Sequence, residues 1–187
     1  LDNDEQLFNE NVRMIRTSLL SRLRDIQSPV ILITSPLSQC GKTTASVLLA
    51  KSIATLGKRV LLVETDFRHS SLADYLQIES ELGLADVLMG ESSDEEAIVK
   101  ALDIGIHVLP AGDKAPLFAL EYLANGQFAA CLKKWRTTYD YILLDAPPVL
   151  PVADARILTA HADGTVMVLR SSRCRRGDAV ESYACLR

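Results

Sequence analysis

The sequence has 187 residues, enough for one domain with a sizeable buried core. With 48% hydrophobic and 24% charged residues it is typical of a globular protein and not of a disordered tail. A formal net charge of −4 argues against nucleic-acid binding through a broad basic surface, and no apolar run approaches the roughly 18 residues of a membrane span. We therefore expect a single domain over residues 1–187 that binds no nucleic acid and reaches a membrane only through a partner or another segment.

Residues 1–28 are predicted to form an N-terminal amphipathic helix that precedes the core domain, residues 29–187. Apolar side chains recur every three or four residues between 4 and 27, which places them on one helical face. They are Phe8, Val12, Ile15, Leu19, Leu23 and Ile26. Pro29 ends the pattern.

Short apolar runs then alternate with helical patterns. The predicted strands are Val30–Thr34, Val60–Val63, Ile106–Leu109, Tyr141–Leu144 and Thr165–Leu169. The predicted helices include Thr43–Leu56, Leu117–Lys134 and Val152–Thr159. Because the strands are apolar throughout, they are expected to be covered on both faces. The alternation predicts an α/β fold with a mostly parallel sheet and helices on both faces.

Two segments carry no predicted chemistry. Residues 69–102 are polar, and their acidic run from Glu91 to Glu96 is interpreted as an exposed loop and the start of a helix. Residues 178–187 have a helical pattern with no strand after it, so we expect the core to stop before a C-terminal tail.

Three polar clusters each follow a predicted strand: Ser35–Thr44, Glu64–Arg68 and Asp145–Pro148. Ligands of open parallel sheets bind beyond the carboxyl ends of the strands, so these clusters should meet at one site. Gly41-Lys42-Thr43-Thr44 lies between a strand and a helix and matches the second half of a phosphate loop. Pro36 stands where the full pattern has glycine. The alternative is a plain helix N-terminus with a solvated lysine.

The chemistry of a phosphate loop assigns a role to each of these residue types. Gly41 lets the backbone approach phosphates, Lys42 reaches the β- and γ-phosphates, and the Thr43 hydroxyl can bind magnesium. The residues predicted to contact the nucleotide are Ser38, Gln39, Cys40, Gly41, Lys42, Thr43 and Thr44, with Arg68 either near a phosphate or paired with an acid.

The acidic residues at the strand ends are predicted to serve magnesium and a proton transfer. Asp145 ends a very apolar strand, where a carboxylate needs a cation nearby, and magnesium fits that need. Glu64 and Asp66 are two residues apart, so their side chains should point the same way. One can approach the metal while the other takes a proton from an incoming hydroxyl.

The four cysteines, Cys40, Cys131, Cys174 and Cys185, have no metal-binding spacing and are interpreted as reduced thiols of a cytosolic protein. Cys40 is singled out by its place in the phosphate loop. A small residue that fills a tight turn is the favoured interpretation, ahead of a redox sensor.

The ordered set of motifs resembles the bacterial tyrosine kinases (BY-kinases) of capsule and exopolysaccharide export, across nearly the whole chain. Residues 41–44 look like their Walker A loop, residues 60–68 (VLLVETDFR) like their second acidic motif, and residues 141–148 (YILLDAPP) like their Walker B motif. Glu10, Arg13 and Arg16 match the E-x-x-R-x-x-R element through which these domains assemble into rings, and residues 108–112 also have the look of the family.

The resemblance implies a P-loop NTPase-like fold and a tyrosine autokinase that uses ATP and Mg²⁺ and phosphorylates a neighbouring subunit in a ring-like homo-oligomer. Lys42 would bind phosphates, and Thr43, Asp66 and Asp145 would serve magnesium. The general base would be Glu64. The implied partner is a transmembrane polysaccharide co-polymerase or activator segment, fused or separate. The implied location is the cytoplasmic face of the bacterial plasma membrane.

The chain departs from the family pattern at three places. Glu64 replaces the usual aspartate, Gln39 replaces a common glycine and would be strained if φ is positive there, and Phe118-Ala119 replaces Asn-Pro. These departures keep open a pseudokinase, a nucleotide-dependent scaffold of the same export system. A partition-type ATPase is disfavoured, since those proteins carry a lysine where this chain has Leu37.

Three further features each allow two interpretations. The stripe Glu10, Arg13 and Arg16 is interpreted as an interface on the face opposite the apolar one, ahead of simple intrahelical pairs. The tyrosines are scattered, and Tyr183 near the end is interpreted as packed or exposed, not as part of a phosphorylated cluster. The basic run from Arg170 to Arg176 is interpreted as a solvated loop, with nucleotide or tail binding as the lesser alternative.

Overall fold

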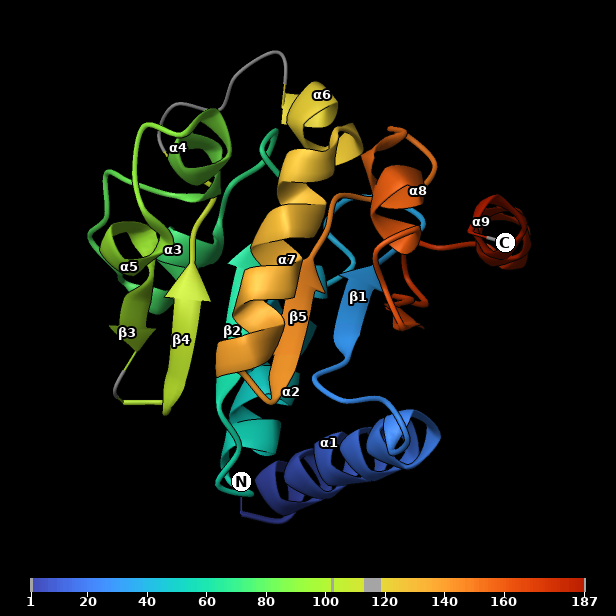
Figure 1. Cartoon of the computed structure of the whole chain (residues 1–187). Coiled ribbons are helices and arrows are strands. Elements are labelled where there is room, and N and C mark those ends of the chain that lie inside the picture. The colour runs from blue at the N-terminus through green and yellow to red at the C-terminus, as the bar shows by residue number, and fades with distance from the viewer. Residues whose placement is uncertain (1, 102, 113–118, 187) are drawn as a thin grey trace.

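The computed structural model describes residues 2–101, 103–112 and 119–186. Within them, a six-stranded sheet has the order β3-β4-β2-β5-β1-β6 (Figure 1). The strands are β1 (Val30–Thr34), β2 (Val60–Glu64), β3 (Val99–Ala101), β4 (Ile106–Leu109), β5 (Tyr141–Asp145) and β6 (Gly164–Met167). All neighbouring pairs are parallel except β3 and β4, which are antiparallel.

Helices cover both faces of the sheet. The helices are α1 (Asp2–Leu23), α2 (Lys42–Ala54), α3 (Leu72–Leu76), α4 (Leu84–Met89), α5 (Asp94–Ala97), α6 (Ala119–Ala124), α7 (Gly126–Thr138), α8 (Asp154–Thr159) and α9 (Arg176–Cys185). Figure 1 shows α7 in front of the central strands and α1 across the end of the sheet opposite the arrowheads, with α9 beyond α8. No helix in the described ranges is both long and apolar enough to cross a membrane.

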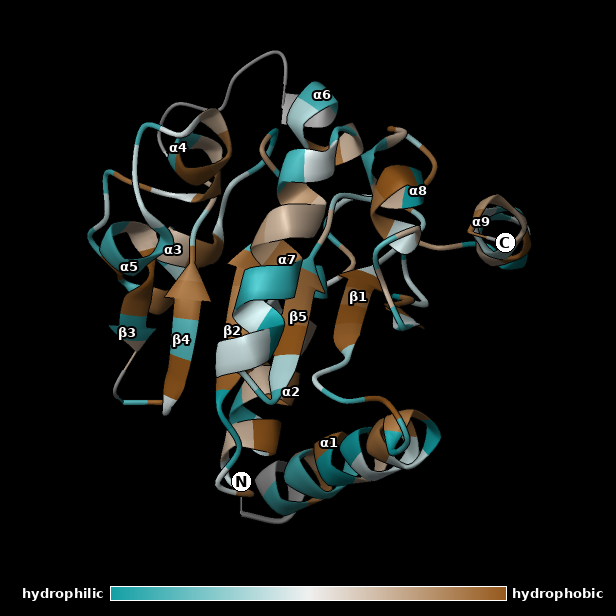
Figure 2. Cartoon of the chain, in the orientation of Figure 1, coloured by the Kyte–Doolittle hydropathy of each residue, from teal (hydrophilic) through white to brown (hydrophobic). Residues whose placement is uncertain are grey.

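Alternate residues of the central strands build two separate cores. Leu32, Leu61 and Leu144 face one core, where Phe128 and Trp135 of α7 pack. The residues between them face the other core, which α2 covers together with Leu23 of α1 and Leu72 of α3. The central strands are therefore apolar along most of their length, as Figure 2 shows by their largely brown colour, with the acids Glu64 and Asp145 at the ends of β2 and β5. This confirms the predicted α/β fold with a mostly parallel sheet and helices on both faces.

The predicted elements agree with the observed ones wherever the apolar pattern is long. β1 and β4 have the predicted bounds, β2 and β5 are one residue longer, and β6 lies at 164–167 instead of 165–169. The predicted helix 117–134 is divided into α6 and α7, because Asn125 caps α7 by accepting a hydrogen bond from the Gln127 amide (3.1 Å). Residues 117 and 118, with the Phe118 departure from the family pattern, lie outside the described residues.

The apolar face predicted for α1 is only partly buried. Leu23 is buried and Leu19 packs against the core, but Phe8 and Ile15 are about half exposed. Ile26 lies beyond the helix, which ends at Leu23. Phe8, Val12 and Ile15 face α2 and β6 across an apolar cavity of about 330 Å³, so this part of the stripe points toward the core without filling the space.

The segment 69–102 contains more structure than a polar loop. It forms α3, α4, α5 and β3, and Leu72, Leu84, Leu88 and Ala97 are buried in the two cores. The prediction of a helix start in the acidic run is confirmed: α5 begins at Asp94, where the Ser93 hydroxyl and the Glu96 carboxylate form a capping box. The edge strand β3 was not predicted, because its three residues are partly or fully exposed and too few to give a periodic signal.

Candidate active site

The phosphate loop joins the end of β1 to the start of α2 and is tied at its base to the loop after β5. The hydroxyl of Thr34 donates to the Pro147 carbonyl (2.7 Å), and the Val149 amide donates to the Ser35 carbonyl (2.8 Å). The Thr65 amide and hydroxyl both donate to the Asp145 carbonyl, at 2.9 and 3.0 Å. Three segments that follow β1, β2 and β5 therefore meet at one edge of the sheet, as their positions in the sequence predicted.

The loop itself requires two left-handed residues. Gly41 caps α2 with φ of +90°, a conformation that glycine adopts without strain. Gln39 has φ of +59°. Glutamine is expected to be strained where this position needs positive φ, and the position does need it. For a residue other than Gly or Asn, this left-handed backbone conformation costs on the order of 1 kcal/mol.

A cleft of about 420 Å³ lies over the N-terminus of α2. It is lined by Ser38, Gln39, Gly41, Lys42, Thr43, Thr44, Asp66, His69, Ser70 and Ser71. Six of the seven predicted loop contacts line it, whereas Cys40 is buried, with 5% of its surface exposed. The first turn of α2 directs free amides and a positive dipole end into this space, which suits an anion.

Asp145 lies beside this cleft, at the end of β5. Its carboxylate is 2% exposed and accepts a hydrogen bond from the Ser46 hydroxyl, 3.0 Å away. Burial raises the pKa of Asp145 to about 6, although hydrogen bonds from Thr43 and Ser46 and the charge of Lys42 oppose the rise. Because burial makes this acid costly to ionise, a nearby cation would stabilise its charged form, and Asp145 is suited to hold one.

Asp66 is the carboxylate that lines the cleft from the β2 side. It is 6% exposed and accepts a hydrogen bond from the His69 amide (3.1 Å). Burial raises the pKa of Asp66, and the nearby charge of Lys42 lowers it in part. The structure thus brings Lys42, Thr43 and Asp66 to one cavity, with Asp145 next to Thr43.

The side chain of Glu64 does not line the cleft. Glu64 and Asp66 therefore do not point the same way, although their two-residue spacing predicted that they would. Its carboxylate is 1% exposed and accepts four hydrogen bonds. The donors are the Ser71 amide (2.6 Å), the Leu72 amide (2.9 Å), the Ser70 hydroxyl (2.9 Å) and the Ala111 amide (3.1 Å). Glu64 therefore fastens the start of α3 and the end of β4 to β2. As placed, it does not face the cleft, and this geometry does not favour the predicted role as general base.

In this structure Arg68 pairs with an acid, which is one of the two roles predicted for it. Its Nε lies 3.4 Å from the carboxylate of Asp154, which is 4% exposed at the start of α8. Arg68 does not line the cleft in the described part of the chain. The acid that it pairs with was not recognised in the sequence, because Asp154 has no motif spacing to the strand ends.

A magnesium ion fits the donor set, although the residues do not form a complete cage. In the described ranges, no group of three or more His, Cys, Asp or Glu side chains could hold a metal ion. Magnesium needs less than that, since it usually binds one or two carboxylates together with substrate phosphates and waters. The Thr43 hydroxyl and the carboxylates of Asp145 and Asp66 are hard oxygen donors of the required kind.

Residues that line the cleft, and one that supports Asp145 behind it, were not predicted from the sequence. His69, Ser70 and Ser71 line the cleft, and the Ser71 hydroxyl lies 3.3 Å from that of Thr43. Their position depends on the Glu64 contacts, which no local pattern reveals. Ser46 could have been found, because it lies four residues after Lys42 and so on the same helical face.

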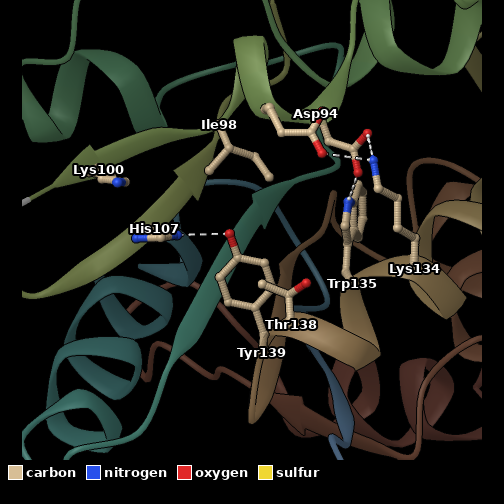
Figure 3. Close-up of a pocket in the computed structure, with 9 residues that line it drawn as sticks. Asp94, Ile98, Lys100, His107, Lys134, Trp135, Thr138 and Tyr139 are labelled. Atoms are coloured by element: carbon tan, nitrogen blue, oxygen red, sulfur yellow. Dashed lines mark hydrogen bonds and ion pairs between the residues drawn. The ribbon is translucent and has the colours of Figure 1, made fainter.

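A second cavity of about 280 Å³ lies between α7, α5 and the β3–β4 pair (Figure 3). Its polar groups satisfy one another: Trp135 Nε1 and Lys134 Nζ both donate to Asp94, at 2.9 Å, and His107 Nδ1 lies 2.8 Å from the Tyr139 hydroxyl. Burial opposes ionisation of Asp94, but the bonds from Lys134 and Trp135 hold its pKa below the usual range. These contacts describe a structural cluster.

The predicted assembly stripe lies on α1, away from the cleft. Arg13 pairs with Glu10 at 2.7 Å, and both side chains are 60% exposed. Arg16 instead donates to the carbonyl (2.8 Å) and hydroxyl (3.2 Å) of Ser52 on α2. The expectation that the whole stripe is free to meet a neighbour is therefore wrong for Arg16, because the helix turns that side chain toward α2.

Comparison with known proteins gives consistent matches. Residues 29–176 match the family model described as AAA domain. The chain is 32% identical over 186 residues to the tyrosine-protein kinase YwqD of Bacillus subtilis. This match covers 97% of this chain and 76% of YwqD. It is 35% identical over 173 residues to EpsB of Ralstonia nicotianae, where the match covers 92% of this chain but only 23% of EpsB.

A solved structure agrees with the sequence matches. The kinase domain of the Escherichia coli tyrosine kinase ETK superposes with a TM-score of 0.91 at 26% identity, over 95% of this chain and 69% of that one. The resemblance deduced from the motifs is confirmed by the similarity to YwqD, which extends over most of both proteins. The chain belongs to the bacterial tyrosine-protein kinase family and carries its P-loop AAA domain.

Proposed function

We propose that this chain transfers the γ-phosphate of Mg·ATP to the hydroxyl of a tyrosine. The observation that carries the proposal is the convergence of Lys42, Thr43 and Asp66 on one cleft, with Asp145 beside Thr43. Phosphoryl transfer needs positioning and charge neutralisation more than covalent chemistry, and this site supplies both.

Each part of the site has a distinct role in the proposal. The backbone amides of residues 38–44 and the Lys42 ammonium hold the β- and γ-phosphates in line for attack. Thr43 and Asp145 would hold the magnesium ion directly and Asp66 through a water molecule, and the ion would neutralise charge on the transferred phosphate. Arg68 is proposed to steady α8 through Asp154, unless nucleotide draws it toward the phosphates.

The proton of the tyrosine hydroxyl is proposed to pass to Asp66. Asp66 lines the cleft, and one of its carboxylate oxygens would accept the proton while the other serves magnesium through a water molecule. Glu64 would serve as the base only after its four donors are released. In the arrangement described above it is a positioning residue that holds Ser70 and Ser71 at the cleft wall.

The proposal extends to assembly and location. Arg13 and Glu10 are exposed, and we propose that they contact a neighbouring copy in a ring-like homo-oligomer, with Arg16 anchoring α1 to α2 behind them. The tyrosine would then come from the adjacent subunit. We further propose that the domain works at the cytoplasmic face of the plasma membrane with a transmembrane polysaccharide co-polymerase or activator segment, fused or separate, and so regulates exopolysaccharide synthesis and export.

A single incubation with Mg·ATP and a tyrosine-containing peptide tests the activity. Mass spectrometry of protein and peptide, together with a phosphate-release assay, separates three outcomes. Phosphotyrosine supports the kinase, free phosphate alone indicates a partition-type ATPase, and neither product with normal ATP binding indicates a pseudokinase. The Lys42→Met variant, treated in the same way, shows whether any signal arises from this cleft.

The pseudokinase is the second candidate, and two observations favour it. Gln39 holds a left-handed conformation that suits glycine, and Glu64 is engaged by four donors instead of facing the cleft. A scaffold that binds ATP without transferring phosphate would tolerate both. Phosphotyrosine in the assay above would exclude it.

A further inference from the structure

Two cysteines from distant parts of the chain lie side by side at the phosphate loop. Cys40 Sγ is 3.1 Å from Cys174 Sγ, although 134 residues separate them in the sequence. Cys40 directly precedes Gly41, and Cys174 lies in the loop between β6 and α9. Both are free thiols.

The loop that carries Cys174 is held against the phosphate loop by more than the sulfur contact. Arg170 Nη1 reaches the Gln39 carbonyl at 3.4 Å. The amides of Arg173 and Cys174 both donate to the Arg170 carbonyl, at 2.9 and 2.8 Å. This tight turn fixes where Cys174 points. The two sulfur atoms are thus brought together by backbone geometry on both sides.

The other two cysteines are placed differently. Cys131 lies on α7, packed against the core on that face of the sheet. Cys185 Sγ accepts a hydrogen bond from Arg156 Nη2 at 3.0 Å, at the far end of α9. The chain therefore offers one pair whose sulfur atoms are close and two cysteines that serve as internal controls.

We propose that oxidation joins Cys40 and Cys174 in a disulfide, and that this bond weakens ATP binding by fixing the phosphate loop. The bond formation rests on the cysteine pair alone. Its effect on ATP rests on the proposed nucleotide site.

The chemistry balances with hydrogen peroxide as the oxidant. Cys174 is partly exposed and Cys40 is 5% exposed, so peroxide meets Cys174 first. The Cys174 sulfur attacks one peroxide oxygen and breaks the O–O bond, which yields a sulfenic acid and water. The Cys40 sulfur then attacks the sulfenic sulfur, a second water leaves, and the two thiols have lost two electrons and two protons. Burial raises the pKa of the Cys174 thiol, so proximity and not high reactivity selects this pair.

The disulfide would displace the part of the loop that meets the phosphates. Bonded sulfur atoms lie about 1 Å closer than the 3.1 Å observed, so Cys40 and the β6–α9 loop must approach each other. Gln39 and Gly41, on either side of Cys40, both hold positive φ and line the cleft. A loop tied in this way cannot adjust its amides to the phosphates.

The test compares reduced and peroxide-treated protein, with Cys174→Ser and Cys131→Ser treated in parallel. Peptide mapping without reductant should recover a linked Cys40–Cys174 peptide pair, about 2 Da lighter than the two free peptides together. Mg·ATP affinity, measured by calorimetry, should fall at least tenfold on oxidation and return with dithiothreitol. Cys131→Ser should behave like the parent, whereas Cys174→Ser should keep its affinity after peroxide.

Each other outcome overturns a stated part of the proposal. Loss of thiols without the linked peptide would show that the pair does not close. A linked peptide with unchanged ATP affinity would show that the bond has no effect on the site. If the reduced parent protein binds no ATP, the proposed function fails instead, and the peptide map still decides whether the bond forms.

Discussion

Ser46 and Asp145 link the helix after the phosphate loop to the end of the central strand β5. The Ser46 hydroxyl, fully buried, donates to the Asp145 carboxylate at 3.0 Å. This bond favours the ionised form of an acid whose pKa is raised to about 6 by burial. The contact therefore adjusts the pH at which Asp145 can hold a cation.

Mg·ATP affinity should consequently depend on pH. Above about pH 6, Asp145 is ionised and can bind the metal. Below this pH, protons compete for the same carboxylate oxygen atoms. The affinity should fall by up to about tenfold for each pH unit below that value. In Ser46→Ala, the pKa of Asp145 should rise further, and the midpoint should move up by about half to one pH unit.

Calorimetry at a series of pH values measures this midpoint. Ser52→Ala is the matched control, because Ser52 lies on the same helix but contacts Arg16 instead of Asp145. An unchanged midpoint in Ser46→Ala would mean that Asp145 does not bind the metal.

Lys42→Met should weaken ATP binding and leave the fold intact. Lys42 lines the cleft, and a charged donor to a phosphate contributes on the order of 1.5–3 kcal/mol, which corresponds to a loss of about ten- to a hundredfold in affinity. Thermal unfolding without nucleotide should change little. Lys51→Met, exposed in the last turn of the same helix, should bind ATP like the parent. Equal affinities of the two variants would refute the placement of the phosphate loop.

Glu64→Gln should destabilise the loop at the cleft wall. The amide can accept some of the four hydrogen bonds, but its NH₂ group meets an N–H or O–H donor, and a buried donor left unpaired costs about 1–3 kcal/mol. The melting temperature should fall by several degrees.

Hydrogen exchange distinguishes this positioning role from that of a base. The amides of Ser71 and Leu72 should exchange faster in Glu64→Gln, because both donate to Glu64. Asp66→Asn should abolish phosphorylation while leaving those amides protected. If Glu64→Gln instead lost activity with unchanged exchange and melting, Glu64 would be the base.

Arg13→Ala should reduce self-association without loosening α1. The Arg13 side chain pairs with the exposed Glu10, so its removal costs the folded monomer at most a few tenths of a kcal/mol. Sedimentation should shift toward smaller species. Arg24→Ala, which breaks a similarly exposed pair with Asp25, is the control. Sedimentation identical to the parent would leave the Glu10–Arg13 pair as an ordinary surface interaction.

The sequence was sufficient for every strand of the described sheet except β3, and for the phosphate loop. Strands β1 and β4 were located by short, mostly apolar runs. Lys42 and Thr43 were located by the phosphate-loop motif and Asp145 by its place at a strand end, because burial on two faces and phosphate binding both leave a local pattern. The family followed from the order of those patterns, since several weak motifs in one sequence order are specific together.

Only the tertiary structure decided which side chains line the cleft. Glu64 and Asp66 have equivalent positions in the sequence, yet Glu64 turns to the amides of Ser71 and Ala111 because a buried carboxylate takes the donors that surround it. The approach of Cys174 to Cys40, and of Arg16 to Ser52, was equally invisible. Local periodicity determines which elements form, whereas contacts between residues far apart in the chain depend on how those elements pack.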